Sequence, residues 1–151
     1  MAARRFTNLR VFAVWLTAFV LTMTIIPLWH ELLMVFVVNT LGWGRYVVPL
    51  VHILYYCIAG LIWVGFFVLH LEYLNRLARK GMLREAALVT LGAELLLIAL
   101  GQAGLTVYGF LASDAPGLLL MAAEGLAGGG MLLYAQKLKA RAGKMDTAGR
   151  G

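Results

Sequence analysis

The sequence predicts an all-α integral membrane protein, a four-transmembrane-helix antiparallel bundle with both termini on the cytoplasmic side. Of its 151 residues, 62% are hydrophobic and 13% are charged, about half of the charged share of soluble domains. The hydrophobic residues fall in four long runs, and a helix needs roughly 20 such residues to cross a bilayer core. The basic residues lie between these runs. We therefore interpret residues 1–151 as a single transmembrane domain.

The four spans are predicted at residues 11–29, 46–71, 85–111 and 117–136. The first run is long and no small-residue cleavage site follows it, so we interpret it as an uncleaved helix rather than a signal peptide. Residues 30–45, HELLMVFVVNTLGWGR, are apolar but too short for another span. We expect them to form an amphipathic segment on the outer surface. The alternative is that the first helix continues past Pro27 with a kink.

The third connection, ASDAPG, is short and contains turn residues. Asp114 suits a turn, and Pro116 suits the first turn of a helix. The third and fourth spans should therefore form a tight antiparallel hairpin. Residues 137–151 are expected to be a polar cytoplasmic tail.

Basic residues mark one side of the predicted membrane. They occur before the first span, between the second and third spans, and after the fourth: Arg4, Arg5, Arg10, Arg76, Arg79, Lys80, Arg84, Lys137, Lys139, Arg141, Lys144 and Arg150. The other two connections contain only Arg45. This is the positive-inside pattern, which places both termini in the cytoplasm. We expect a multi-pass protein of a bacterial or archaeal inner membrane. Its partners would be the lipid bilayer and other integral membrane subunits or further copies of itself, and not nucleic acid.

Three polar residues are predicted at similar depth in the outer half of the membrane. His52 lies roughly 9 Å, Glu124 roughly 10 Å and Gln102 roughly 13 Å below the outer face, at about 1.5 Å per helical residue. A charged carboxylate near the bilayer centre costs at least a few kcal/mol, so we expect Glu124 to meet Gln102 or His52. Small residues four apart permit close helix packing, and such pairs flank these side chains: Ala99 with Ala103, Ala123 with Ala127, and Gly125 with Gly129.

A second polar set lies in the inner half. His70 and Glu72 come near the cytoplasmic end of the second span, where they can sit among lipid headgroups. Glu94 lies deeper, roughly 14 Å from the inner end of the third span. We expect Glu94 to face the bundle or a partner chain.

The histidines also suit a haem, because two helices can each supply an axial imidazole. His52 and His30 form the candidate pair, while the inner His70 has no histidine partner. The single Cys57 excludes an internal disulfide, and no metal site is predicted. Motifs of metalloproteases, serine hydrolases and phosphate-binding loops are absent from the sequence, so we expect no enzyme acting alone.

The sequence therefore favours a small accessory or anchor subunit of a membrane complex that transfers electrons or protons. An internal polar site would hold haem b, a quinone or a proton, and its candidate residues are His52, His30, Gln102, Glu124 and His70. The first alternative is a small oligomeric transporter or channel that uses Glu94 and Glu124. The second is a membrane enzyme in which His52 and Glu124 form an acid–base pair.

Overall fold

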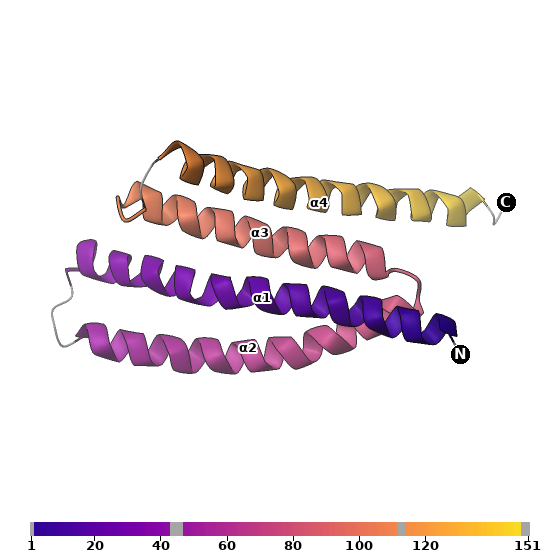
Figure 1. The fold of residues 1–151 in the computed structure, drawn as a ribbon, viewed down its shortest axis with the longest axis horizontal. Coiled ribbons are helices and arrows are strands. Elements are labelled where there is room, and N and C mark those ends of the chain that lie inside the picture. Colours follow the sequence, from indigo (N-terminus) through magenta and orange to yellow (C-terminus); the bar gives the residue numbers. More distant parts are fainter. Residues whose placement is uncertain (1, 43–46, 112–113, 149–151) are drawn as a thin grey trace.

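The computed structural model describes residues 2–42, 47–111 and 114–148, and the side chains of residues 8–140 within those ranges. The described chain forms α1 (Ala2–Asn39), α2 (Val47–Arg79), α3 (Leu83–Val107) and α4 (Ala115–Ala148). Each of the four helices is long and apolar enough to cross a membrane. Consecutive helices run in opposite directions (Figure 1). The predicted all-helical architecture with four potential spans is confirmed.

The predicted surface segment at residues 30–45 is wrong for the part that the structure describes. α1 continues through Pro27 to Asn39 as one helix, and residues 43–45 lie outside the described ranges. Proline inside a helix removes one backbone hydrogen bond, but Val35 and Val37 beyond it are buried. The apolar residues after Pro27 therefore continue the helix and contribute to its packing.

Glycine ends α2 and α3 in the same way. After α2, the Gly81 N–H donates to the Ala78 carbonyl at 3.1 Å and the Met82 N–H to the Leu77 carbonyl at 2.9 Å. This is the Schellman pattern, which needs a left-handed residue at the helix end. Gly81 has φ +75° and Gly109, which follows α3, has φ +76°. Both chain reversals thus depend on residues without a Cβ.

Asp114 caps the start of α4, where the turn was predicted. Its Oδ1 accepts a hydrogen bond from the Gly117 N–H at 3.1 Å, which is the N-cap interaction. Pro116 lies in the first turn. At the other end α4 continues to Ala148, so most of the predicted tail, residues 137–151, extends the helix; residues 149–151 lie outside the described ranges.

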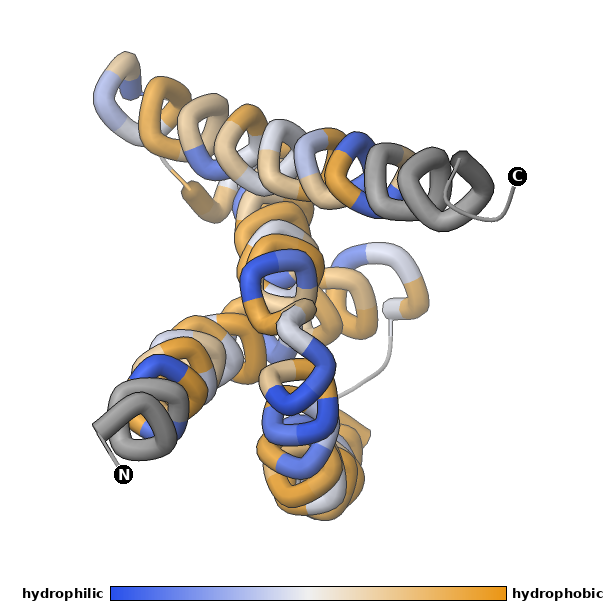
Figure 2. The backbone as a smooth tube through the Cα atoms, turned by 90° about the vertical axis from the view of Figure 1, so that its right-hand side faces the viewer, coloured by the Kyte–Doolittle hydropathy of each residue, from blue (hydrophilic) through white to orange (hydrophobic). Residues whose placement is uncertain are grey.

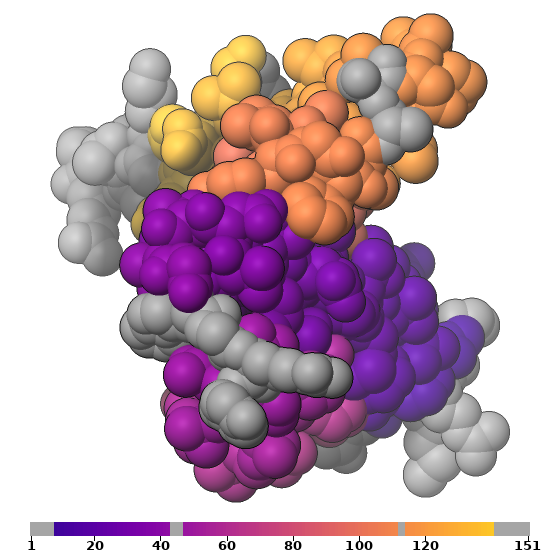
Figure 3. All heavy atoms as spheres, turned by 90° about the vertical axis from the view of Figure 1, so that its left-hand side faces the viewer, coloured from indigo at the N-terminus to yellow at the C-terminus, as the bar shows by residue number. Residues whose placement is uncertain are grey.

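The helices form an open bundle with α3 at its centre. α3 packs against all three other helices, whereas α4 packs only against α3 and makes no contact with α1 or α2 in the described residues. Figure 2 shows α4 crossing α3 apart from the other pair. From the opposite end, α1 lies between α2 and the α3–α4 hairpin (Figure 3). The buried side chains that define the core therefore come mainly from α1 and α3.

Close contact between α3 and α4 is centred on two glycines. A Cβ placed on Gly128 would lie 2.7 Å from the Gly92 carbonyl oxygen, and one on Gly92 would lie 2.9 Å from the Gly128 carbonyl oxygen. The predicted tight packing of these helices is confirmed, although Gly129 faces open space. Gly101 of α3 lies instead against the Leu28 side chain of α1.

The surface matches a protein surrounded by lipid. Large apolar side chains are exposed along every helix; Leu61 and Leu126 are each 77% exposed. The start of α1, the end of α4 and the α2–α3 turn lie at one end of the molecule (Figure 1), where hydrophilic residues gather (Figure 2). The basic segments of the sequence thus share one end of the fold.

Cys57 offers a direct test of membrane insertion. It is exposed on α2, ten residues after the helix begins, or about 15 Å along its axis. A water-soluble maleimide needs the thiolate and should leave Cys57 unmodified in sealed or open vesicles but modify it after denaturation in detergent. The control is Thr40→Cys with Cys57→Ser, because Thr40 follows α1 at its exposed end; this variant should react. Rapid modification of Cys57 in vesicles would show that α2 is not in the bilayer.

Candidate functional site

Glu94 is the most deeply buried acidic side chain among the described residues. It is 6% exposed and lies near the middle of α3. The Thr22 hydroxyl of α1 donates a hydrogen bond to Oε1 at 3.0 Å. Oε2 is also buried and has no hydrogen-bond partner among the described residues. The prediction that Glu94 faces the interior of the bundle therefore agrees with its position.

Glu94 and His70 line the same groove. The groove lies between α2 and α3, has a volume of about 450 Å³, and is otherwise lined mainly by apolar side chains such as Phe66, Leu69 and Leu97. His70 is 7% exposed, and its Nε2 is buried without a partner in the described chain. Two polar atoms, one from each helix, thus lie enclosed behind an apolar surface. Such atoms are rare in native interiors and call for an explanation.

The turn between α2 and α3 explains why these residues lie at the same depth. Met82 lies in that turn, and His70 and Glu94 are each twelve residues from it in the sequence. In an antiparallel helical hairpin, two residues equally distant from the turn lie at the same height along the helix axes, because each helix rises by the same amount per residue. This symmetry was available in the sequence, but we had assigned His70 to the headgroup region. Thr22 gave no comparable signal, because a threonine in an apolar helix is common.

Aromatic rings complete the surroundings of His70. Phe66 stacks on the imidazole with ring centroids 5.1 Å apart and an interplanar angle of 15°. Tyr73 lies on the other side at 6.3 Å. Glu72, by contrast, is exposed and pairs with Arg76 at 2.6 Å. Glu72 therefore belongs to the basic end of the molecule and not to the buried site.

The outer polar set is not brought together. His52 lies on α2 and Glu124 on α4, and these helices make no contact in the described chain. Glu124 Oε2 is buried and accepts no hydrogen bond from the described residues. The predicted acid–base pair of His52 and Glu124 is therefore contradicted, because α3 lies between helices that the prediction placed in contact.

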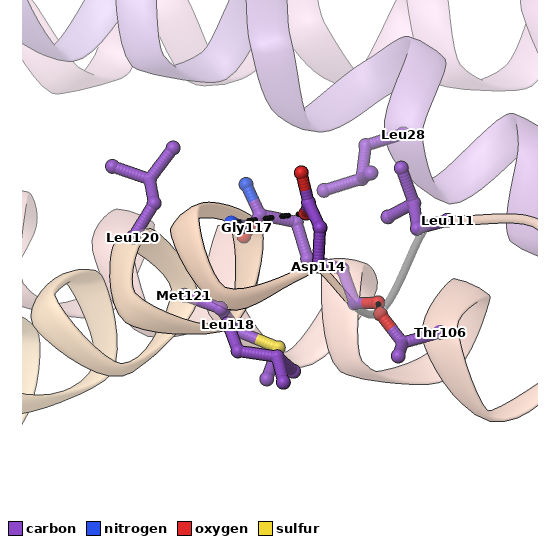
Figure 4. Close-up of a pocket in the computed structure, with 9 residues that line it drawn as sticks. Leu28, Thr106, Leu111, Asp114, Gly117, Leu118, Leu120 and Met121 are labelled. Carbon is purple, nitrogen blue, oxygen red and sulfur yellow. Dashed lines mark hydrogen bonds between the residues drawn. The ribbon is translucent and has the colours of Figure 1, made fainter.

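Gln102 lines a different pocket, with a volume of about 310 Å³. Leu28 of α1 and the first turns of α4, including Gly117 and Met121, form its other walls. Figure 4 shows the capping hydrogen bond of Asp114 at this pocket. The pocket is mainly apolar, and Glu124 is not part of its lining.

His30 and His52 do meet, at the opposite end of the molecule from the basic segments. Their ring centroids are 4.6 Å apart with an interplanar angle of 86°, and Tyr56 contacts both rings. His30 is 4% exposed, and neither ring nitrogen has a hydrogen-bond partner among the described residues. Tyr55 donates its hydroxyl to the Ile26 carbonyl at 2.7 Å and ties α2 to α1 here.

This pair does not fit the haem that we had considered. Axial imidazoles bind iron from opposite faces of the porphyrin, so the flat macrocycle must lie between them. The His30 and His52 rings are in edge-to-face contact and leave no room for it.

Purified protein is therefore expected to lack a haem spectrum. We would record absorption after isolation in mild detergent, first oxidised and then reduced with dithionite. A reduced α-band that is lost in His30→Ala and in His52→Ala would contradict this arrangement of the two rings.

Comparison with known protein families, curated proteins and solved structures finds no match to this chain. A function for this chain must therefore be inferred from its own residues. In the part of the chain that the structure describes, no three His, Cys, Asp or Glu side chains are grouped as metal ligands. Glu94 and His70 form the candidate site, because they line one groove and each has a buried polar atom without a hydrogen-bond partner in the described chain.

Proposed function

We propose that this chain is a small integral membrane subunit that works within a larger assembly and binds a proton at Glu94 and His70. The observation that carries the proposal is the Glu94 carboxyl group. It is buried in an apolar helix layer, and one of its oxygens has no partner in the described chain. Intramembrane ionisable residues are expensive and are retained for function by default.

A proton fits the enclosed atoms better than the other ligands that we considered. Glu94 Oε2 and His70 Nε2 each lie behind the groove surface, so a quinone ring could reach them only after the side chains move. A proton needs no such rearrangement. No counter-charge pairs with Glu94 among the described residues, and the neutral acid is then the cheaper buried form.

The architecture favours a subunit of a larger complex over a protein that acts alone. α4 is attached through α3 alone, and the bundle is open. Nearly all described residues belong to helices, which leaves little chain for catalytic loops. We place both termini in the cytoplasm of a bacterial or archaeal cell, because the basic segments share one end of the fold and cytoplasmic loops are enriched in Lys and Arg.

An oligomeric proton transporter is the second candidate, since Glu124 Oε2 is also buried without a partner in the described chain. Glu94 bonds Thr22 of α1, whereas Gly92 and Leu96 of the same helix meet α4. The two acids therefore lie toward different neighbours of α3. A pathway that uses both acids would need a second copy of the chain.

Two measurements test these proposals. The tagged full chain would be isolated from its own membranes in mild detergent, and the mass of the particle measured. The subunit proposal expects a complex with other proteins; a particle made of this chain alone would overturn it.

The second measurement is proton flux through vesicles that contain only this chain and an enclosed pH-sensitive dye. The subunit proposal expects no flux above that of empty vesicles. Flux that disappears in Glu94→Gln and in Glu124→Gln would instead establish the transporter. Glu72→Gln is the matched control, because Glu72 is exposed and paired with Arg76.

A further inference from the structure

A second groove opens at the basic end of the molecule, between α2 and α4. Its volume is about 350 Å³, and α3 forms its floor with Ala86 and Val89. Leu77 of α2 and Leu132 of α4 form facing walls. The main chains of α2 and α4 do not approach each other in the described chain, and the groove lies between them. It adjoins the groove beside Glu94, because Tyr73 and Val89 line both.

The groove is polar at one end and apolar along the rest. Gln136 and Lys139 of α4 lie at its polar end, together with Glu85 of α3. The rest of the lining is apolar or aromatic and includes Val89, one turn from Glu85 on α3, and Leu132, two turns from Lys139 on α4. An occupant must therefore combine a polar group with an extended apolar part.

Positive charge dominates around the polar end. Arg84 is held above the Tyr134 ring at 5.3 Å and donates to the tyrosine hydroxyl at 3.2 Å. Arg79 ends α2, Lys80 follows it in the turn, and both are exposed. Arg76 is neutralised by Glu72, so Glu85 is the acidic group that faces these cations in the groove lining. The positive charge around this end of the groove favours an occupant whose polar group is anionic.

We propose that this groove binds an anionic phospholipid. Its phosphate would lie against Lys139 and Gln136, and one acyl chain would lie along Leu77, Val89 and Leu132. Basic pockets between transmembrane helices on the cytoplasmic side recognise anionic headgroups in this manner. The inference requires only that the chain sits in a bilayer, and it is independent of proton binding at Glu94.

The test is thermal unfolding of the full chain in neutral detergent with added phosphatidylglycerol or with phosphatidylcholine of the same acyl chains. Each variant is compared with its own lipid-free sample. Phosphatidylglycerol is expected to raise the unfolding temperature of the native protein, and phosphatidylcholine to raise it much less. Lys139→Gln should weaken the apparent affinity for phosphatidylglycerol about fivefold, as expected for one basic residue at an anionic lipid.

Lys137→Gln is the matched control, because it removes the same charge from the same helix but does not line the groove. It should keep the native response. The proposal would be overturned if the two lipids raised the unfolding temperature equally, or if the two lysine variants lost the same affinity. Stabilisation of the same size by inorganic phosphate alone would also overturn it. Val89→Trp, which fills the groove, should abolish the phosphatidylglycerol effect; an unchanged effect would also overturn it.

Discussion

Thr22→Val is expected to destabilise the protein by about 1–3 kcal/mol, the usual cost of leaving a buried polar atom without its partner. Valine has nearly the shape of threonine, but it cannot donate the 3.0 Å hydrogen bond to Glu94 Oε1. Oε2 already has no partner among the described residues, so both carboxyl oxygens would be left unsatisfied. The measurement is reversible unfolding in mixed detergent micelles.

Thr24→Val is the matched control for this change. Thr24 is exposed, and its hydroxyl donates only to the Val20 carbonyl of its own helix, so its loss should cost less than about 0.5 kcal/mol. The double variant Thr22→Val with Glu94→Met should recover most of the stability, because replacing both partners by apolar groups is nearly neutral. A double variant as unstable as Thr22→Val would show that the hydrogen bond does not explain the loss.

Gly128→Leu is expected to separate α4 from α3. Even a Cβ at this position would lie 2.7 Å from the Gly92 carbonyl oxygen and 3.0 Å from the Leu96 backbone nitrogen. These are main-chain atoms, which cannot turn away as a side chain can. Overpacking costs about 1–3 kcal/mol for smaller additions, and α4 has no other helix to hold it in the described chain. Unfolding in mixed micelles and protease cleavage of α4 would both report the change.

Gly130→Leu provides the comparison at a position two residues along α4. A Cβ there meets nothing within 4 Å, and both variants gain the same intrinsic helix preference. Gly130→Leu should therefore keep native stability and native resistance to protease. If the two leucine variants behaved alike, the close approach of α3 and α4 at Gly92 and Gly128 would be disproved.

Hydropathy and turn residues were sufficient to predict the helices and their order. The four apolar runs correspond to α1 to α4, and Asp114 caps α4 where the turn was expected. The error at residues 30–45 came from ending the first span at residue 29 and preferring a separate surface segment to a helix that continues past Pro27. Proline costs one hydrogen bond in a helix interior, but neighbouring helices in an apolar setting tolerate it.

Which side chains face one another could not be predicted in the same way. In a soluble protein, a polar face and an apolar face fix the rotation of a helix about its axis. These helices are apolar on nearly all sides, so that signal is missing. His52 and Glu124 were predicted at similar depths, yet they belong to helices that do not pack against each other in the described chain. His70 and Glu94 were assigned to one half of the membrane, but their shared groove appears only when α2 packs on α3.

The central claim is that Glu94 is a neutral acid within the bilayer and is available to a proton. Dicyclohexylcarbodiimide, which dissolves in lipid, adds to a protonated carboxyl group and rearranges to a stable N-acylurea of known added mass. The full chain would be treated in vesicles and its peptides analysed by mass spectrometry, with a water-soluble carbodiimide as the parallel reagent and Glu94→Gln as the control. The account predicts that the lipid-soluble reagent enters the adjoining apolar groove and modifies Glu94 as the groove side chains move aside, and that the water-soluble reagent does not. Modification of Glu94 by the water-soluble reagent, or by neither reagent, would contradict it.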